Sequence, residues 1–110
     1  MGKFVKGDVV TVPFPFSDLT GERVRPAFVV ASLLGDDVIL CMITTQKRRD
    51  SYSIPLTAGD FSSGGLPCDS YVRPNRLFTA DSNIISSRKG TLTETKIKEI
   101  IGKIIELIGK

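Results

Sequence analysis

The chain has 110 residues and a formal net charge of +3, with 41% hydrophobic and 25% charged residues. This is the composition of an ordinary globular protein, and the length predicts a single domain over residues 1–110. Histidine is absent, which excludes any mechanism that uses an imidazole as acid, base or metal ligand. Two cysteines are too few for a thiolate zinc site, and we expect neither a metal nor another cofactor.

The sequence also indicates where the protein works. Residues 1–8 contain no uninterrupted apolar run, and no stretch approaches the roughly 18 apolar residues of a membrane helix. We therefore expect a cytoplasmic protein without membrane contact. In that reducing compartment Cys41 and Cys68 are expected to be free thiols, with Cys41 a small core residue inside the apolar run 38–43.

The first half of the chain predicts three strands. Residues 8–16 are rich in β-branched and aromatic side chains and contain two prolines at their end, which cannot donate hydrogen bonds to a sheet. The apolar runs 27–31 and 38–44 flank a turn at residues 35–37. This arrangement predicts that the two runs pair as an antiparallel hairpin.

The second half predicts shorter and less regular strands. Residues 51–56 contain a proline and suit the edge of a sheet, whereas residues 59–67 are expected to form a loop. A strand over residues 69–79 should be interrupted near Pro74 by a bulge or kink, and residues 83–86 are expected to add another short strand. Five to seven short strands are typical of a small barrel or sandwich.

The end of the chain changes period from strand to helix. Isoleucines recur at the spacing of one helical face, at Ile97, Ile100, Ile101, Ile104, Ile105 and Ile108. We predict a helix over residues 94–108, with Thr93 as its N-cap and Gly109 as its stop. Gly102 lies in the interior of this helix, where glycine costs about 1 kcal/mol relative to alanine, so we expect it to mark a close contact with another element.

Three polar clusters lie at the ends of predicted strands, where a β scaffold usually presents functional groups. They are the loop 17–25, the segment 44–49 and the pair Arg73 and Arg76. Each has an ordinary structural explanation when taken alone: a surface arginine, a β-branched strand residue or a solvated basic loop. Their order along the chain makes the functional interpretation stronger.

The polar clusters belong to a series of short segments: Lys6 to Val10 (Lys-Gly-Asp-Val-Val), Arg25 to Val30 (Arg-Pro-Ala-Phe-Val-Val), Ile43 to Gln46 (Ile-Thr-Thr-Gln), Arg76 to Thr79 (Arg-Leu-Phe-Thr) and Gly90 to Thr93 (Gly-Thr-Leu-Thr). In order and spacing this series resembles the MazF/PemK family of toxin endoribonucleases over nearly the whole chain. The resemblance implies a mainly β fold, an SH3-like barrel related to the CcdB toxin with a C-terminal helix. It also implies a homodimer in the bacterial cytoplasm, metal-independent and sequence-selective cleavage of single-stranded RNA, and a cognate antitoxin that occupies the RNA-binding groove and binds DNA together with the toxin.

The resemblance also implies site residues by position. The family's active-site arginine falls on Arg25, its active-site threonine or serine on Thr44, and the acidic residue of the first loop on Glu22. RNA contacts are expected from Ser17, Asp18, Thr45, Gln46, Lys47, Arg48, Arg49, Arg73 and Arg76. Some members use an arginine and an aspartate late in the barrel, but here Arg73 is followed by Pro74 and has no such partner in sequence. The proton-transfer groups therefore stay open.

RNA cleavage fits the residue inventory because the substrate supplies its own nucleophile, the 2′-hydroxyl, so that no imidazole or metal is needed. Arg25 stays charged at every relevant pH and can direct two donors at phosphate oxygens. Thr44 can donate one further hydrogen bond. An arginine is a poor base, so Glu22 or Asp18 is the nearest candidate for that role.

Two other functions are compatible with the same fold. One is a CcdB-like toxin that inhibits a topoisomerase without catalysis, and the other is a non-catalytic nucleic-acid-binding barrel. The second of these would need exposed aromatic side chains for base stacking, but Tyr52 and Tyr71 are the only tyrosines and tryptophan is absent. Arg25, Thr44 and the basic run 47–49 favour RNA cleavage, although fold similarity alone does not decide among the three.

Overall fold

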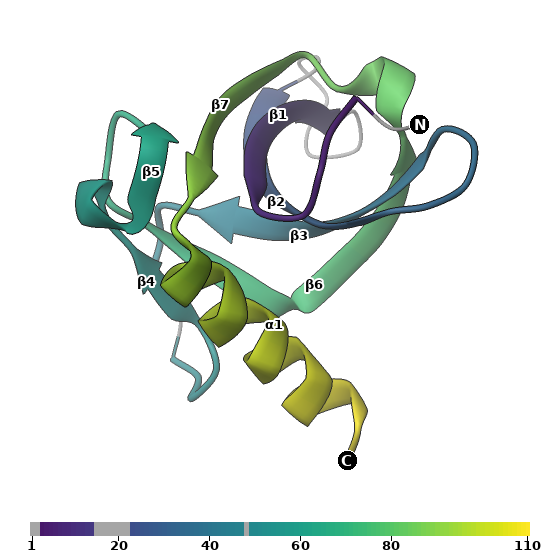
Figure 1. The fold of residues 1–110 in the computed structure, drawn as a ribbon. Helices are drawn as coiled ribbons and strands as arrows, with labels where there is room; N and C mark the ends of the chain where they lie inside the picture. Colours follow the sequence, from purple (N-terminus) through teal and green to yellow (C-terminus); the bar gives the residue numbers. More distant parts are fainter. Residues whose placement is uncertain (1–2, 15–22, 48) are drawn as a thin grey trace.

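The computed structural model describes residues 3–14, 23–47 and 49–110, which form strands, two short 3₁₀ helices and one α-helix (Figure 1). In chain order these are β1 (Asp8–Phe14), β2 (Arg23–Ser32), β3 (Asp37–Thr44), β4 (Ile54–Leu56), η1 (Ala58–Asp60), β5 (Phe61–Gly64), β6 (Ser70–Asp81), η2 (Ser82–Ile84), β7 (Ser87–Leu92) and α1 (Glu94–Ile108). No helix within the described ranges is long and apolar enough to span a membrane.

The strands form one antiparallel sheet in the order β4-β6-β3-β2-β1-β7-β5. Its two edge strands, β4 and β5, are separated in the chain only by residues 57–60. A chain this short cannot cross a flat sheet of such width, so the sheet must curl until its edges approach each other. The result is the curled half-barrel of Figure 1, with α1 against β6 on the outside of the curl. The expected mainly β fold with a C-terminal helix is confirmed.

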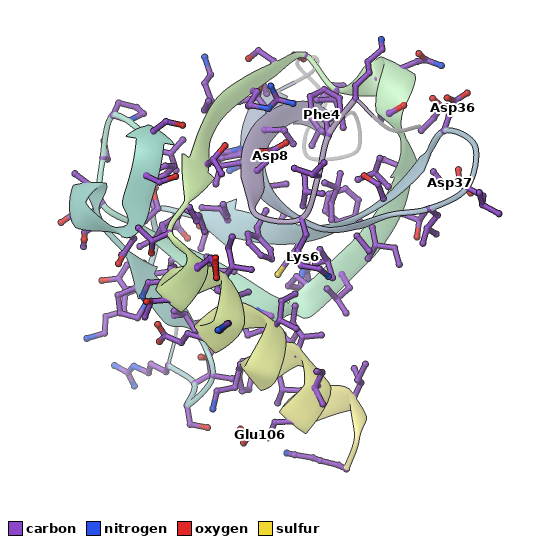
Figure 2. The ribbon with its side chains drawn as sticks, in the orientation of Figure 1. Phe4, Lys6, Asp8, Asp36, Asp37 and Glu106 are labelled. Atoms are coloured by element: carbon purple, nitrogen blue, oxygen red, sulfur yellow. The ribbon has the colours of Figure 1, made fainter. Side chains whose placement is uncertain are left out.

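Two apolar clusters occupy opposite faces of the sheet. The outer cluster packs β-strand side chains such as Phe28 and Ile43 against Ile100 and Ile104 of α1. The inner cluster fills the curl and consists of Phe4, Val10, Val12, Ala27, Val29, Val38 and Leu40. Figure 2 shows Phe4 within this curl. Alternation of side chains along β2 and β3 thus gives each strand two buried faces, which explains their nearly continuous apolar sequences.

Several predicted elements are confirmed. The helix begins and ends where the isoleucine periodicity places it, and the Thr93 hydroxyl accepts a hydrogen bond from the Lys96 amide as an N-cap should. β2 and β3 pair as the predicted antiparallel hairpin, and β4 lies at a sheet edge. The predicted interruption near Pro74 is a bulge: Cys41 pairs with Leu77, but Ile43 pairs with Val72.

The strand predictions were wrong in two places. The expected loop 59–67 contains β5. Of the expected strand 83–86, residues 83 and 84 belong to the 3₁₀ helix η2 and residues 85 and 86 to no strand, with β7 following at Ser87. β5 and β7 are rich in serine, glycine and charged residues, so they lack the apolar alternation that marks a strand. They are strands because β7 pairs with both β1 and β5, which is a tertiary effect.

Two smaller expectations also need correction. β2 begins at Arg23 and not at Ala27, because residues 23–26 already pair with β1. Pairing with β3 begins only after Pro26, which has no amide hydrogen to donate. Gly102 does not mark a close contact. It is exposed, and a Cβ atom added there would meet no described heavy atom within 4 Å.

The segment at residues 6–10 has a structural role. Gly7 has a φ of 101°, and a Cβ atom there would lie 2.3 Å from Cδ1 of Ile97 in α1. The buried carboxylate of Asp8 accepts hydrogen bonds from the Thr91 hydroxyl at 3.0 Å and from Nε of Arg88 at 3.1 Å. Figure 2 shows Asp8 beside β7. This segment therefore joins the start of the chain to β7 and α1, and it takes no part in the candidate site.

Candidate active site

Arg25 and Thr44 lie on β2 and β3, two neighbouring strands near the middle of the sheet. The last pair of the β2–β3 ladder at this end is Ala27 with Met42. Arg25 precedes Ala27 by two residues and Thr44 follows Met42 by two residues. The two strands are not paired beyond this point, but an antiparallel register continued by two residues would set Arg25 opposite Thr44.

Both side chains belong to the inner face of the sheet. Arg25 is paired with Val12 of β1, and directly paired residues share a face. Thr44 shares its face with Met42 because side chains alternate along a strand. Val12 belongs to the inner cluster and Met42 packs against it. The two predicted catalytic residues thus share one face at one end of the curl, and each is partly exposed.

A cavity of about 720 Å³ opens on this same inner face. Val12 and Met42 form part of its wall. Val12 is the pairing partner of Arg25, and Met42 precedes Thr44 by two residues on the same strand. β6 supplies most of the rest, including the exposed side chain of Arg76. Its size lies within the range of ligand-binding clefts, and its wall combines apolar surface with the charged residues Arg76 and Asp81.

The hydroxyl of Thr44 has a defined orientation. Its oxygen accepts a hydrogen bond of 3.1 Å from the backbone amide of Gln46. A hydroxyl has a single hydrogen to donate, and with the oxygen engaged as an acceptor that hydrogen is available for another group. Thr44 can therefore donate to an anionic oxygen beside Arg25, which suits it to stabilise negative charge.

The bulge in β6 separates Arg73 from Arg76. Arg76 lines the inner cavity, but the Arg73 side chain is only 14% exposed and its Nη2 lies 3.7 Å from Oδ2 of Asp50. Asp50 belongs to the β3–β4 loop (residues 45–53). The structure therefore separates Arg73 from Arg76, the predicted RNA-binding arginine that lines the cavity.

Asp50 is the residue of this region that sequence reasoning missed. Its Oδ1 accepts hydrogen bonds from the amides of Tyr52 at 3.2 Å and Ser53 at 2.7 Å. Burial alone would raise the pKa of Asp50, but the bonds from Ser53 and Tyr52 and the charge of Arg73 hold that pKa below its ordinary value. The signal was present in the sequence, since an aspartate followed by polar residues two and three positions later is typical of an Asx turn.

The other predicted RNA-binding residues of the β3–β4 loop are exposed. Gln46, Lys47 and Arg49 lie on the surface, so their side chains are accessible to a polyanion. Thr45 is also exposed, but it lines a second cavity of about 400 Å³ together with Pro26, on the outer face of the sheet. The predicted residues Ser17, Asp18, Glu22 and Arg48 lie outside the described residues.

Potential metal ligands are scattered over the described part of the molecule. Within residues 3–14, 23–47 and 49–110, no three or more aspartate, glutamate or cysteine side chains gather in a group that could hold a metal ion. The Asp50 carboxylate is already engaged by two amides and lies beside a guanidinium, which makes it a poor ligand.

Comparison with known proteins identifies the family. The model of a family described as PemK-like, MazF-like toxin of type II toxin-antitoxin systems matches residues 5–108. The chain belongs to this family. The resemblance to the MazF/PemK family that the order and spacing of the motifs indicated is thus confirmed. A search of curated proteins gave no match.

Solved structures show the same fold for this MazF/PemK-family toxin. An endoribonuclease in complex with its cognate antitoxin from a mycobacterial species has a TM-score of 0.77 and 16% identity, covering 96% of this chain and 95% of that one. MazF from Deinococcus radiodurans has a TM-score of 0.76 and 16% identity, covering 97% of each chain. A second mycobacterial endoribonuclease has a TM-score of 0.74 and 18% identity, covering 99% and 94%.

Proposed function

We propose that this toxin is a sequence-selective endoribonuclease that cleaves single-stranded RNA without a metal ion. The observation that carries the proposal is that Arg25 and Thr44 belong to the inner face of neighbouring strands, near a cavity that Arg76 lines. Structures of the same fold that are named endoribonucleases support it. An RNA substrate also accords with a cytoplasmic location.

The reaction is an internal transesterification. The ribose 2′-oxygen attacks the adjacent phosphorus and forms a new P–O bond while the bond to the 5′-oxygen breaks. The proton of the 2′-hydroxyl goes to a base, and the departing 5′-oxygen receives a proton. Arg25 donates two hydrogen bonds to the phosphoryl oxygens, and Thr44 donates one. Both interactions strengthen as negative charge develops in the transition state, which is the condition for catalysis. Products carry a 2′,3′-cyclic phosphate and a 5′-hydroxyl.

The base in this proposal is Glu22. Arginine and threonine cannot accept the proton at neutral pH, so a carboxylate must be brought to the 2′-hydroxyl. Glu22 is the residue before Arg23, where β2 begins, and is three residues from Arg25 along the chain. Asp18 in the same loop is the alternative.

RNA is held by groups at this end of the sheet. Lys47 and Arg49 are exposed and supply positive charge that suits a phosphate backbone. Arg76 supplies a further cation on the cavity wall. The full set of proposed RNA contacts from the two loops and β6 is Ser17, Asp18, Thr45, Gln46, Lys47, Arg48, Arg49 and Arg76. Tyr52 and Tyr71 are partly buried, so recognition rests more on polar groups than on stacking.

The proposal includes two protein partners, a second copy of the chain and a cognate antitoxin. Exposed apolar side chains on one side of α1 support self-association: Ile105 and Ile108 are 61% and 70% exposed. A structure of this fold in complex with its cognate antitoxin supports the second partner. Sedimentation of the purified protein at micromolar concentration should give a dimer.

The test of the proposed function is cleavage of a long single-stranded RNA with mapping of the fragment ends. We expect a small set of cut sites, cyclic phosphate termini and full activity in excess EDTA. Replacing the single ribose at one site by deoxyribose should stop cutting there, because the nucleophile is removed while the phosphate contacts remain. Arg25→Ala should nearly abolish cleavage, whereas Lys98→Ala on the exposed side of α1 should not change it.

The same experiment distinguishes the two other functions. A topoisomerase-inhibiting toxin or a non-catalytic barrel leaves the RNA intact at any protein concentration. Rapid cutting at the deoxyribose position would show that water is the nucleophile, and the roles given to Arg25 and Thr44 would then be wrong.

A further inference from the structure

We propose that Asp50 and Arg73 form a positioning pair that fixes the β3–β4 loop and, through it, the orientation of the Thr44 hydroxyl. This inference rests on the proposed ribonuclease function. It gives Arg73 a role other than direct contact with RNA, and it gives Asp50 a role in the activity.

Arg73 is fixed to the sheet by its backbone and its side chain. Its carbonyl oxygen accepts a hydrogen bond of 2.8 Å from the thiol of Cys41 on β3. Its Nε is completely buried, with no hydrogen-bond partner among the described residues, and its Nη2 faces Asp50. A phosphate cannot reach a buried Nε, so the Nε–Nη2 edge of Arg73 is not presented to solvent, and the side chain as a whole is 14% exposed.

Asp50 connects the loop to that arginine. One carboxylate oxygen accepts from the amides of Tyr52 and Ser53, and the other accepts from the Ser53 hydroxyl at 3.1 Å and lies 3.7 Å from Arg73. The Asp50 side chain is 10% exposed. A single carboxylate thus shapes the end of the β3–β4 loop and attaches it to the bulge of β6.

The other end of the loop controls Thr44. The Gln46 amide donates to the Thr44 oxygen, so the direction of the hydroxyl depends on where residue 46 lies. The loop is therefore held at its start by Thr44 and near its end by Asp50. Releasing the Asp50 end allows residue 46 to move, and a donor displaced by about 1 Å can cost up to roughly 100-fold in rate.

The test compares Asp50→Asn, Arg73→Met and the double variant. Asparagine keeps an oxygen for the two amides but removes the charge facing Arg73, and methionine keeps much of the apolar length of arginine. We expect each single variant to lower the single-turnover cleavage rate by about tenfold at saturating RNA. The double variant should be no slower than either single variant, because the two residues act through one contact. Arg73→Lys, which keeps the charge, should recover most of the rate.

Arg76→Met is the matched contrast, because the same substitution three residues later removes an arginine that faces the cavity. Removing one phosphate-binding cation lowers the slope of log Kd against log salt concentration by about 0.7 for single-stranded RNA. We expect this change for Arg76→Met and no change of slope for Arg73→Met. A reduced slope for Arg73→Met combined with wild-type activity of Asp50→Asn would show that Arg73 binds phosphate directly, and the pair would be refuted. Wild-type rates for both single variants would refute it equally.

Hydrogen exchange separates failure of the pair from failure of the proposed function. In Arg73→Met the Tyr52 and Ser53 amides should exchange faster, while amides in the middle of α1 keep their protection, which also shows that the variant is folded. If the wild-type protein cuts no RNA, the proposed function is wrong and the catalytic part of this inference falls with it. Unchanged exchange at Tyr52 and Ser53 would overturn the contact itself, whatever the activity.

Discussion

The hydroxyl of Thr44 offers the sharpest test of the candidate site, because its removal can be made nearly isosteric. Thr44→Val replaces the hydroxyl by a methyl group on the same β-branched side chain. The substitution keeps the strand propensity and the shape of the residue. It removes the acceptor of the Gln46 amide and the donor proposed for the phosphate. Thr44→Ser restores the hydroxyl and removes only the methyl group.

The structure allows the two effects to be separated by size. The bond from the Gln46 amide is exposed, so its loss should cost no more than about 1 kcal/mol of stability, or roughly 4 °C in Tm for a domain of this size. A donor aimed at the developing charge of a transition state is worth far more, typically about 100- to 1000-fold in rate. We therefore expect Thr44→Val to lower the single-turnover rate by that factor with a small change in Tm.

The assay is single-turnover cleavage of an RNA oligonucleotide that carries one mapped cut site, together with a thermal melt of each variant. Thr44→Ser should cleave within about tenfold of the wild-type rate, since the rate depends on the hydroxyl. Thr95→Val, an equivalent substitution at an exposed threonine in the first turn of α1, should behave as wild type. Wild-type cleavage by Thr44→Val would refute the reasoning. Equal losses in Thr44→Val and Thr44→Ser would show that the methyl group matters instead of the hydroxyl.

Three further predictions concern other parts of the molecule. Neutralising the basic run 47–49 should weaken binding to RNAs of any sequence and lower the log–log salt slope by about 0.7 for each cation that binds a phosphate; an unchanged slope would return these residues to a solvated loop. Gly102→Ala should raise the free energy of unfolding by about 1 kcal/mol in urea titrations, because the site is exposed with room for a methyl group; a lower stability would contradict this. Burial raises the pKa of Cys41 to about 12, although the charge of Arg73 acts in the opposite direction. A maleimide at mildly alkaline pH should therefore label only the exposed Cys68, and mass spectrometry should show one adduct per chain; two adducts would contradict this.

Local periodicity accounts for the parts of the fold that could be predicted. The isoleucines of α1 follow the helical repeat that buries one face, and the apolar runs of β2 and β3 are typical of strands buried on both faces. Each of these elements can therefore be predicted from its own sequence. β7 does not satisfy such a repeat. Ser87–Leu92 contains charged residues and a glycine, and it becomes a strand because β1 and β5 supply hydrogen-bonding partners on its two sides.

The candidate site divides in the same way. Arg25 and Thr44 could be selected from the order of the motifs, and the alternation of β2 and β3 then explains why they share a face. Their catalytic roles stay a prediction. The separation of Arg73 from Arg76 depends on the size of the bulge between Ile43 and Cys41 in the pairing with β6, which no local pattern specifies. The Asx turn at Asp50 could have been read from the sequence, but its pairing with Arg73 could not, because the two residues are 23 positions apart and meet only through the fold.

The pairing of β1 with β7, near the end of the chain, has a consequence for folding during synthesis on the ribosome. β1 pairs with β7, the Leu92 amide donates to the Gly7 carbonyl, and the Asp8 carboxylate finds two of its donors beyond residue 87. A nascent chain that ends at β6 leaves β1 with an open edge, Asp8 without those donors and the outer cluster without Ile100 and Ile104. β1, the neighbour of the strand that carries Arg25, therefore gains its second partner only when β7 has been made, and the outer cluster is complete only when α1 follows. Chains released before β7 should not form a stable sheet.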